Sequence, residues 1–214
     1  MRFRDRQQAG TALAERLLVR REEGALPDPV VLALPRGGVV VAAEVARALD
    51  APLDVLVARK IGAPFQSELG VGAIAGEDEP FFDERALDRL GLSKAALEPI
   101  VEQERDELHR REQLYRKGRA IPELTGHTAV VVDDGVATGV TALAALRSVR
   151  RHDPGRVTLA VPVCSPEAAL LVQEQADEVV CLHEPVAFMA VGLWYEEFDQ
   201  VTDDQVLDVL HGLS

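Results

Sequence analysis

Cysteine, aromatic residues and long apolar runs are all scarce in this chain of 214 residues. Its two cysteines, Cys164 and Cys181, are too few for a disulfide framework and do not have the spacing of metal ligands. No apolar run approaches the roughly 20 residues that span a bilayer, so we expect no transmembrane helix and no membrane partner. The polar N-terminus lacks the apolar region of a secretory signal, and we therefore expect a cytoplasmic protein.

Cationic residues are scarce as well. The chain has 23 Lys and Arg against 36 Asp and Glu, which gives a net charge of −13. Broad nucleic-acid binding depends on cations that neutralise phosphates, so we expect no nucleic-acid partner. If such an acidic protein binds a polyphosphate, it needs backbone donors, a few well-placed cations and a metal ion.

Short apolar runs alternate with helical patterns along most of the chain. This alternation predicts a Rossmann-like α/β fold, a mostly parallel sheet with helices on both faces that binds ligands at the carboxyl ends of its strands. We expect a single domain over residues 1–214, because the length and the hydrophobic fraction of 47% suit one core. The expected strands are Val30–Leu34, Leu53–Ala58, Thr128–Val132, Val157–Val163 and Glu178–Leu182. The expected helices follow Asp5, span Val39–Leu49 and Thr138–Val149, and follow Ser165 and Thr202.

A charge-dense segment at about residues 83–119 interrupts this alternation. Asp83 and Ser93 have the character of helix N-caps, and Gly91 separates two predicted helices. One interpretation is a solvated helical hairpin that covers a sheet edge. The other is a dimer contact or an active-site lid, because long insertions between core strands are often functional.

Two adjacent carboxylates end one of the predicted strands. Asp133 and Asp134 follow an apolar run, and a loop of small and hydroxyl-bearing residues leads from them into a helix. The free N–H groups of that helix N-terminus make a cradle for phosphate, and carboxylate oxygens suit ribose hydroxyls or magnesium. Asp-Asp-Gly is also common turn chemistry, so the pair alone leaves both interpretations open. Neither a Walker loop nor a Gly-x-Gly-x-x-Gly dinucleotide motif is present.

Four apolar residues, two acidic residues and a loop ending in Thr-Gly-x-Thr resemble the signature of type I phosphoribosyltransferases. That signature binds 5-phosphoribosyl-1-pyrophosphate (PRPP). The resemblance implies that Asp133 and Asp134 hold the ribose and magnesium and act in catalysis. It implies that the loop binds the 5-phosphate through Gly135, Val136, Ala137, Thr138, Gly139, Val140 and Thr141. Many family members carry Thr or Ser in place of Ala137 and a bulkier aliphatic residue in place of Gly135.

A second segment supports the resemblance. Family members bind pyrophosphate with a short loop after the first core strand, and Leu34–Gly38 is similar to that loop. Gly37 and Gly38 are expected to present amides to the anion, while Arg36 supplies a fork of donors. An ordinary strand-to-helix turn is the alternative interpretation.

A basic pair ends the next predicted strand. By the resemblance, Arg59 and Lys60 extend toward pyrophosphate, and Lys60 acts in catalysis. The segment 61–76 is rich in glycine and small residues and suits a mobile loop plus a short hairpin. By the resemblance, residues 61–70 correspond to the mobile loop that closes over the reacting centre and excludes water. Glu68, within this segment, is the candidate general base.

The acceptor is expected to lie under a C-terminal hood at about residues 184–200. The resemblance to purine-salvage members implies that Phe188 stacks on the acceptor, with Trp194 as an alternative. Glu196 or Glu197 is expected to face an exocyclic amine or the metal ion. Aromatic residues near a terminus are also often part of the core.

Outside about residues 78–120, the chain is most similar to stand-alone bacterial phosphoribosyltransferase-like proteins of unassigned acceptor. The resemblance implies a Mg²⁺-dependent transfer of phosphoribosyl from PRPP to a nitrogen nucleophile, a nucleobase or related heterocycle, with release of pyrophosphate. A PRPP sensor without turnover and a sugar-phosphate hydrolase are the alternatives. The expected partners are PRPP and a small-molecule acceptor, and a homodimer is the default assembly.

Overall fold

A five-stranded parallel sheet forms the centre of the molecule, in the strand order β2-β1-β6-β7-β8. The computed structural model describes residues 2–212. The strands are β1 (Pro29–Ala33), β2 (Leu53–Val55), β6 (Thr128–Val132), β7 (Arg156–Val163) and β8 (Glu178–His183). Every residue of β1 and of β6 is buried, as expected for apolar strands that are covered on both faces. The mostly parallel α/β fold is confirmed.

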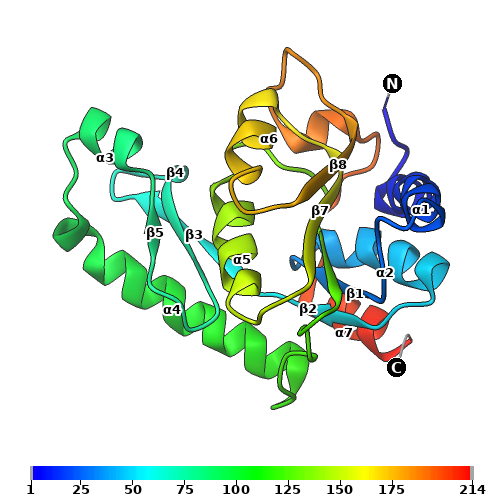
Figure 1. Cartoon of the computed structure of the whole chain (residues 1–214). Helices are drawn as coiled ribbons and strands as arrows, with labels where there is room; N and C mark the ends of the chain where they lie inside the picture. The colour runs from blue at the N-terminus through cyan, green and yellow to red at the C-terminus, as the bar shows by residue number, and fades with distance from the viewer. Residues whose placement is uncertain (1, 213–214) are drawn as a thin grey trace.

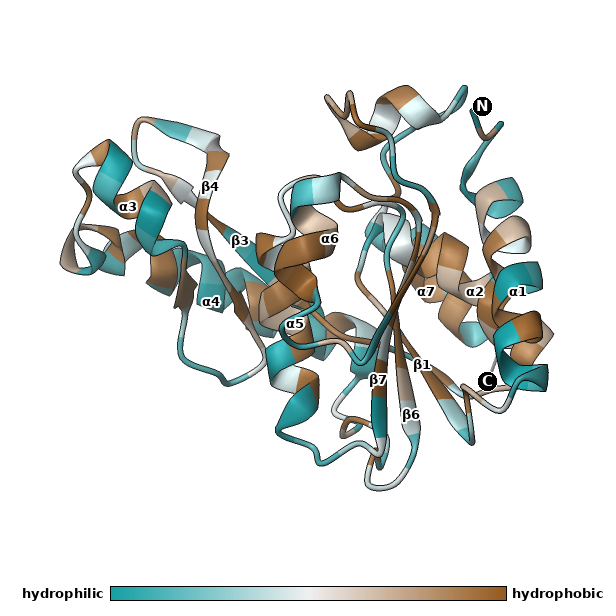
Figure 2. Ribbon diagram, turned by 45° about the horizontal axis from the view of Figure 1, so that its top comes forward, coloured by the Kyte–Doolittle hydropathy of each residue, from teal (hydrophilic) through white to brown (hydrophobic). Residues whose placement is uncertain are grey.

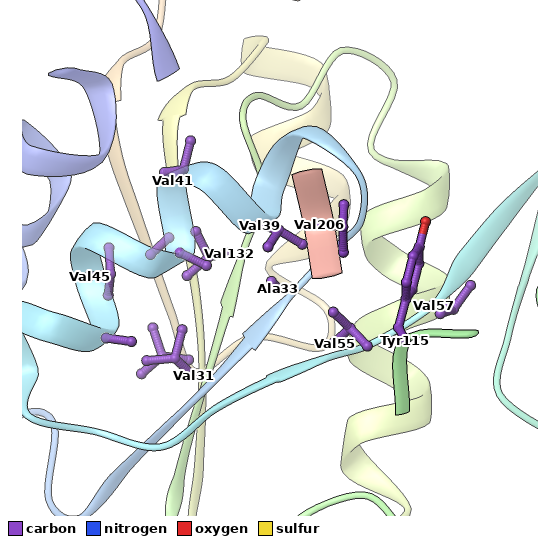
Figure 3. Close-up of a cluster of buried hydrophobic side chains, with 14 of the residues drawn as sticks. Val31, Ala33, Val39, Val41, Val45, Val55, Val57, Tyr115, Val132 and Val206 are labelled. Atoms are coloured by element: carbon purple, nitrogen blue, oxygen red, sulfur yellow. The ribbon is translucent and has the colours of Figure 1, made fainter. Parts of the chain in front are cut away.

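Helices cover both faces of this sheet (Figure 1). One face carries α1 (Arg6–Glu22), α2 (Gly37–Leu49) and α7 (Asp203–His211), and the other carries α5 (Val140–Arg150) and α6 (Pro166–Val172). Strand alternation divides the core, because Val31 and Ala33 pack toward α2 whereas Val30 and Leu32 pack toward α5. Figure 3 shows the α2 side of this core, with Val31, Ala33 and Val132 beneath the valines of α2. Much of α2 and α5 consists of hydrophobic residues, which are brown in Figure 2.

The helix starts follow the predicted caps. The side chains of Asp5, Asp83, Ser93 and Ser165 each accept a backbone N–H of the helix that follows. Thr202 and Gln205 form the full capping box at the start of α7. These predictions are confirmed. No helix within residues 2–212 is long and apolar enough to cross a membrane.

A smaller antiparallel sheet lies beside the central one (Figure 1). It consists of β3 (Ala58–Ala63), β4 (Gln66–Ala75) and β5 (Phe81–Phe82). The prediction of one strand over 53–58 is wrong, because β2 ends at Val55 and Arg59 and Lys60 lie inside β3. The segment 61–70 is largely a paired hairpin rather than a loop. Its glycines permit close strand approach: a Cβ on Gly62 would lie 2.3 Å from the Ser67 carbonyl oxygen.

The charge-dense segment forms α3 (Glu84–Leu90) and α4 (Lys94–Arg116), as predicted. The buried side chains of α4 are Leu97, Leu108 and Tyr115. Near the end of α4, Arg116 donates to the Val55 carbonyl at the edge strand β2. The insertion therefore covers the antiparallel sheet and one edge of the parallel sheet, while hydrophilic residues occupy much of the rest of α4 (Figure 2).

Candidate functional site

The site lies where the strand order reverses, at the carboxyl ends of β1 and β6. Sequential strands run outward from this point in both directions, and α/β sheets bind ligands at such a switch point. The register pairs Ala33 with Val132, so both strands end at the same level. Asp133 and Asp134 follow β6, and the Pro35–Gly38 turn follows β1. The peptide bond between Pro35 and Arg36 is cis.

The two carboxylates are held by different partners. Asp133 accepts the backbone N–H of Asp134 at 2.8 Å through Oδ1. Asp134 accepts the Nε–H of Arg6 at 2.7 Å through Oδ2, and the two side chains are only 14% and 11% exposed. The hydroxyl of Tyr195 donates to the Asp134 carbonyl oxygen at 2.5 Å. The pair is therefore a fixed feature of the fold and not a mobile surface turn.

Burial raises the pKa of both carboxyl groups. The pKa of Asp133 lies well above its usual range, first because of burial and then because of the neighbouring Asp134 charge. Burial also raises the pKa of Asp134, although the Arg6 cation opposes that shift. Keeping both groups ionised costs free energy that a bound cation would recover. The pair is thus suited to hold a hard metal ion.

The predicted pyrophosphate loop lies directly against this pair. A Cβ on Gly37 would lie 1.9 Å from Asp134 Oδ2, and one on Gly38 would lie 2.9 Å from the Cα of Asp133. Only glycine allows this approach of the backbone to the carboxylates. Gly37 and Gly38 were predicted to lie in the turn before the helix, but they form the first residues of α2, and the start of a helix presents unpaired N–H groups. Two segments far apart in sequence therefore form one site.

The loop after the carboxylates runs into the N-terminus of α5. Gly139 is the N-cap, at φ +80°, and makes no side-chain cap, which leaves the first N–H groups of α5 for a ligand. The corner between β7 and α6 fixes the loop. Ser165 donates its hydroxyl to the Ala137 carbonyl at 2.6 Å and its N–H to the Val136 carbonyl at 2.9 Å. Val136 in turn donates its N–H to the Val163 carbonyl at 2.9 Å.

The model of the phosphoribosyl transferase domain matches residues 5–197 of this chain. The chain belongs to this family. A Mycobacterium tuberculosis H37Rv protein that carries the provisional name phosphoribosyl transferase is 45% identical over 208 residues. That alignment covers 97% of this chain and 46% of the relative, so the chain spans about half the length of the curated relatives it matches.

Solved structures show the same fold. The crystal structure of TT1426 from Thermus thermophilus is 45% identical, covers 100% of both chains and has a TM-score of 0.81. A Neisseria gonorrhoeae protein with bound ppGpp covers 99% of this chain and 98% of its own, with a TM-score of 0.51. At 16% identity, this second similarity concerns the fold alone.

The departure from the common phosphoribosyltransferase signature at Gly135 has a packing cause. A Cβ at this position would lie 2.5 Å from Val191 Cγ1 and 2.9 Å from Val163 Cγ1. Val191 begins the short helix η1 (Val191–Trp194) of the predicted hood. A bulkier residue at 135 would collide with the hood unless Val191 moved. At the second departure, Ala137 is exposed, and its carbonyl is the acceptor for Ser165.

The predicted basic pair lies within β3, and its two side chains have different neighbours. Arg59 points toward α4, where its Nη2 lies 2.6 Å from Glu104 Oε2. The Lys60 side chain runs over Gly70, where a Cβ would lie 3.2 Å from Lys60 Cδ. A pocket of about 520 Å³ between the hairpin and α4 is lined by both residues and by Glu104. The side chain of Glu68 lies outside the described part of the chain.

The hood is tied to the N-terminus by backbone hydrogen bonds. Phe3 donates to the Trp194 carbonyl at 2.8 Å, and Glu196 donates to the Phe3 carbonyl at 2.8 Å. Phe188, the predicted stacking residue, is half-buried in the segment between β8 and η1. Within the hood, Tyr195 stacks on Phe198 with ring centroids 4.9 Å apart.

Several residues of the site were not predicted. Arg6 binds Asp134 across the molecule, donates to the Asp199 carbonyl at 2.7 Å and stacks over the Phe198 ring at 3.8 Å from its centroid. Ser165 was predicted only as a helix cap, and Tyr195 was given no role. The Asp5 cap located the start of α1, but no local pattern indicates that Arg6 pairs with a residue 128 positions away.

Proposed function

We propose that this protein is a magnesium-dependent phosphoribosyltransferase that transfers 5-phosphoribosyl from PRPP to a nitrogen acceptor, a nucleobase or related heterocycle. The observation that carries the proposal is the contact between the Asp133–Asp134 pair and the Gly37–Gly38 turn. It unites a candidate ribose and metal site with a candidate pyrophosphate site. The N-terminus of α5, which continues from the same loop, completes the set with a candidate 5-phosphate site.

Magnesium suits the two half-buried carboxylates. Among the described side chains, which do not include that of Glu68, no group of three or more His, Cys, Asp or Glu residues could hold a metal ion without other ligands. This fits an ion that keeps several waters and is shared with substrate phosphates, rather than one enclosed by the protein. When bound by Asp133 and Asp134, magnesium would supply positive charge that offsets the charge on pyrophosphate.

The proposed transfer consists of three bond changes, and residues of the chain assist each of them. The bond from ribosyl C1 to the pyrophosphate oxygen breaks, a bond from C1 to the acceptor nitrogen forms, and that nitrogen loses a proton. Asp133 and Asp134 position the ribose and stabilise positive charge on an oxocarbenium-like sugar. Arg36, Lys60 and Arg59 offset the negative charge on pyrophosphate. Glu68 takes the proton.

The acceptor part of the proposal rests on the hood. Phe188 stacks on the heterocycle, while Tyr195 and Phe198 keep the hood against the N-terminal segment. Val186 and Met189, on either side of Phe188, are 94% and 84% exposed. We further propose a cytoplasmic homodimer whose ligands are PRPP and the small acceptor.

A PRPP-binding sensor without turnover is the second candidate. It is favoured by the ion pair of Arg59 with Glu104, which keeps a predicted pyrophosphate ligand against α4. The Neisseria gonorrhoeae protein that shares the fold carries bound ppGpp. A sensor would keep the phosphate sites and have no need for a general base.

Pyrophosphate release with Mg²⁺, PRPP and a panel of nucleobases tests the proposal. A transferase releases pyrophosphate in step with an N-ribosylated acceptor, a hydrolase releases it without an acceptor, and a sensor binds PRPP and releases none. Asp134→Asn is the matched control, because it keeps the shape of the side chain and removes its charge. We expect it to fold and to lose turnover by orders of magnitude; wild-type turnover in this variant would contradict the assigned site.

A further inference from the structure

Asp203, the first residue of α7, connects the proposed pyrophosphate loop to the helical insertion. Its Oδ1 accepts the hydroxyl of Tyr115 at 2.5 Å and lies 3.6 Å from Nη1 of Arg36. Its Oδ2 accepts Nη2–H of Arg110 at 3.3 Å. Tyr115 and Arg110 come from α4, whereas Arg36 immediately precedes α2. One carboxylate thus joins three elements that are remote in sequence.

The position of this carboxylate is well determined. Tyr115 is 2% exposed, and its ring lies in the core near Val55 and Val57 (Figure 3). The hydrogen bond from Tyr115, followed by that from Arg110, lowers the pKa of Asp203, so its charge is retained at neutral pH. The capping box of Thr202 and Gln205 fixes the adjacent backbone. Asp203 is therefore a rigid anion held by the core and by a helix start.

The ion pair with Asp203 restrains the Arg36 side chain but leaves its N–H groups available for a ligand. At 3.6 Å its Nη1 is within ion-pair distance of Asp203 but beyond a hydrogen bond, and the Arg36 side chain is 25% exposed. A guanidinium has five N–H donors, so the contact leaves most of them for an anion. Fixing a long side chain before binding removes part of the entropy loss on binding, an effect of about threefold to tenfold in affinity.

We propose that Asp203 is a positioning residue that orients Arg36 toward the pyrophosphate of PRPP, and that Tyr115 fixes Asp203 for this purpose. The inference rests on the proposed function and extends it, because it gives the insertion helix α4 and the helix α7 a part in binding pyrophosphate. Neither helix contributes a residue to the carboxylate pair or to the loop at 135–141.

The test compares Asp203→Asn with Asp204→Asn. Asp204 is exposed in the same first turn, so its substitution removes the same charge from the same helix N-terminus without touching Arg36. Isothermal titration measures the affinity for Mg²⁺-pyrophosphate and for ribose 5-phosphate, which lacks the pyrophosphate. We expect Asp203→Asn to weaken pyrophosphate binding about threefold to tenfold and to leave ribose 5-phosphate binding unchanged. Asp204→Asn should change neither.

A measurement without ligand decides the same point independently. The Nε–Hε signal of Arg36, assigned by its loss in Arg36→Lys, should show a single ordered environment by NMR in the wild type and in Asp204→Asn. It should average toward the free-arginine position in Asp203→Asn and partly so in Tyr115→Phe. The inference is overturned if the Arg36 signal is the same in Asp203→Asn as in the wild type. It is also overturned if Asp203→Asn binds pyrophosphate more tightly. If the wild type binds no pyrophosphate, the proposed function fails, and the NMR result still decides whether Asp203 orients Arg36.

Discussion

At the scale of single residues, the site is defined by how closely its parts approach one another. Gly37 brings the backbone of α2 onto the Asp134 carboxylate, and Gly135 brings the loop 135–141 onto the hood. Each contact excludes even a methyl group. The residues that differ from the common family signature are therefore informative, since Gly135 is coupled to Val191 and the two are expected to vary together.

The first prediction concerns that coupling. Gly135→Ala should destabilise the protein by about 1–3 kcal/mol, because the added Cβ lies 2.5 Å from Val191 Cγ1. Val191→Ala should recover part of the loss when the two substitutions are combined, since it removes the colliding methyl group. Urea unfolding of the four proteins in a double-mutant cycle measures the coupling. Additive effects would mean that the loop and the hood do not pack as described.

At the scale of elements, the corner between β7 and α6 supports the loop 135–141 that follows the carboxylate pair. Ser165 caps α6 by accepting the Ala168 N–H at 3.0 Å, and it also holds two carbonyl groups of the loop. The N-terminus of α5 alone gives no reason for the loop to take one shape. The β7–α6 corner supplies that reason, so it belongs to the site although it need not touch the ligand.

The second prediction separates the two roles of Ser165. Ser165→Ala should cost about 0.5–2 kcal/mol of stability through the lost cap and should also weaken ribose 5-phosphate binding. Ser93→Ala is the matched control, because Ser93 caps α4 in the same way through the Ala96 N–H at 3.3 Å and lies in the insertion, away from the loop. Urea unfolding and ligand titration measure both effects. Equal ligand affinity in both variants would restrict Ser165 to capping.

The sequence predicted the parallel sheet well because its strands carry a local signal. β1 and β6 are buried on both faces, and an unbroken apolar run is the pattern such strands require. The hairpin of β3 and β4 was predicted only as a short one beside a mobile loop, because glycine is common in loops, whereas here Gly62 serves close strand packing. A run of apolar residues also concealed the break after Val55, where the chain leaves the parallel sheet.

The candidate site was predictable to the same extent. Asp133, Asp134, Gly37 and Gly38 were found because they belong to continuous motifs at strand ends, and strand pairing brings them together. Arg6 and Asp203 were not found, because each acts through a side chain that meets the site from a distant segment. Such pairings follow from tertiary packing and leave no periodic pattern in the sequence.

At the scale of the whole molecule, three segments that are remote in sequence or structure form the candidate site. The carboxylate pair, the α2 start and the α5 start come from different parts of the chain, and the hood closes on the loop through Val191. A ligand that contacts all of them binds only the folded protein. Its binding must therefore raise the free energy of unfolding by mass action.

The last prediction uses this linkage to test PRPP as the ligand. With Mg²⁺ and PRPP at about a hundred times its dissociation constant, the protein should gain about 2.7 kcal/mol of stability, measured as a rise in the thermal midpoint. Chelation of Mg²⁺ should remove most of the gain, because the carboxylates and the pyrophosphate then repel one another.

The variant Asp134→Asn should also lose most of the stabilisation by PRPP. Because Arg6 then lacks its charged partner, the thermal midpoint without ligand must be measured for each protein. Ribose 5-phosphate lacks the pyrophosphate that we propose binds at the Gly37–Gly38 turn, so it should stabilise the protein less than PRPP. An absence of any shift at millimolar PRPP with Mg²⁺ would contradict the proposed substrate, and an equal shift after chelation would contradict the metal.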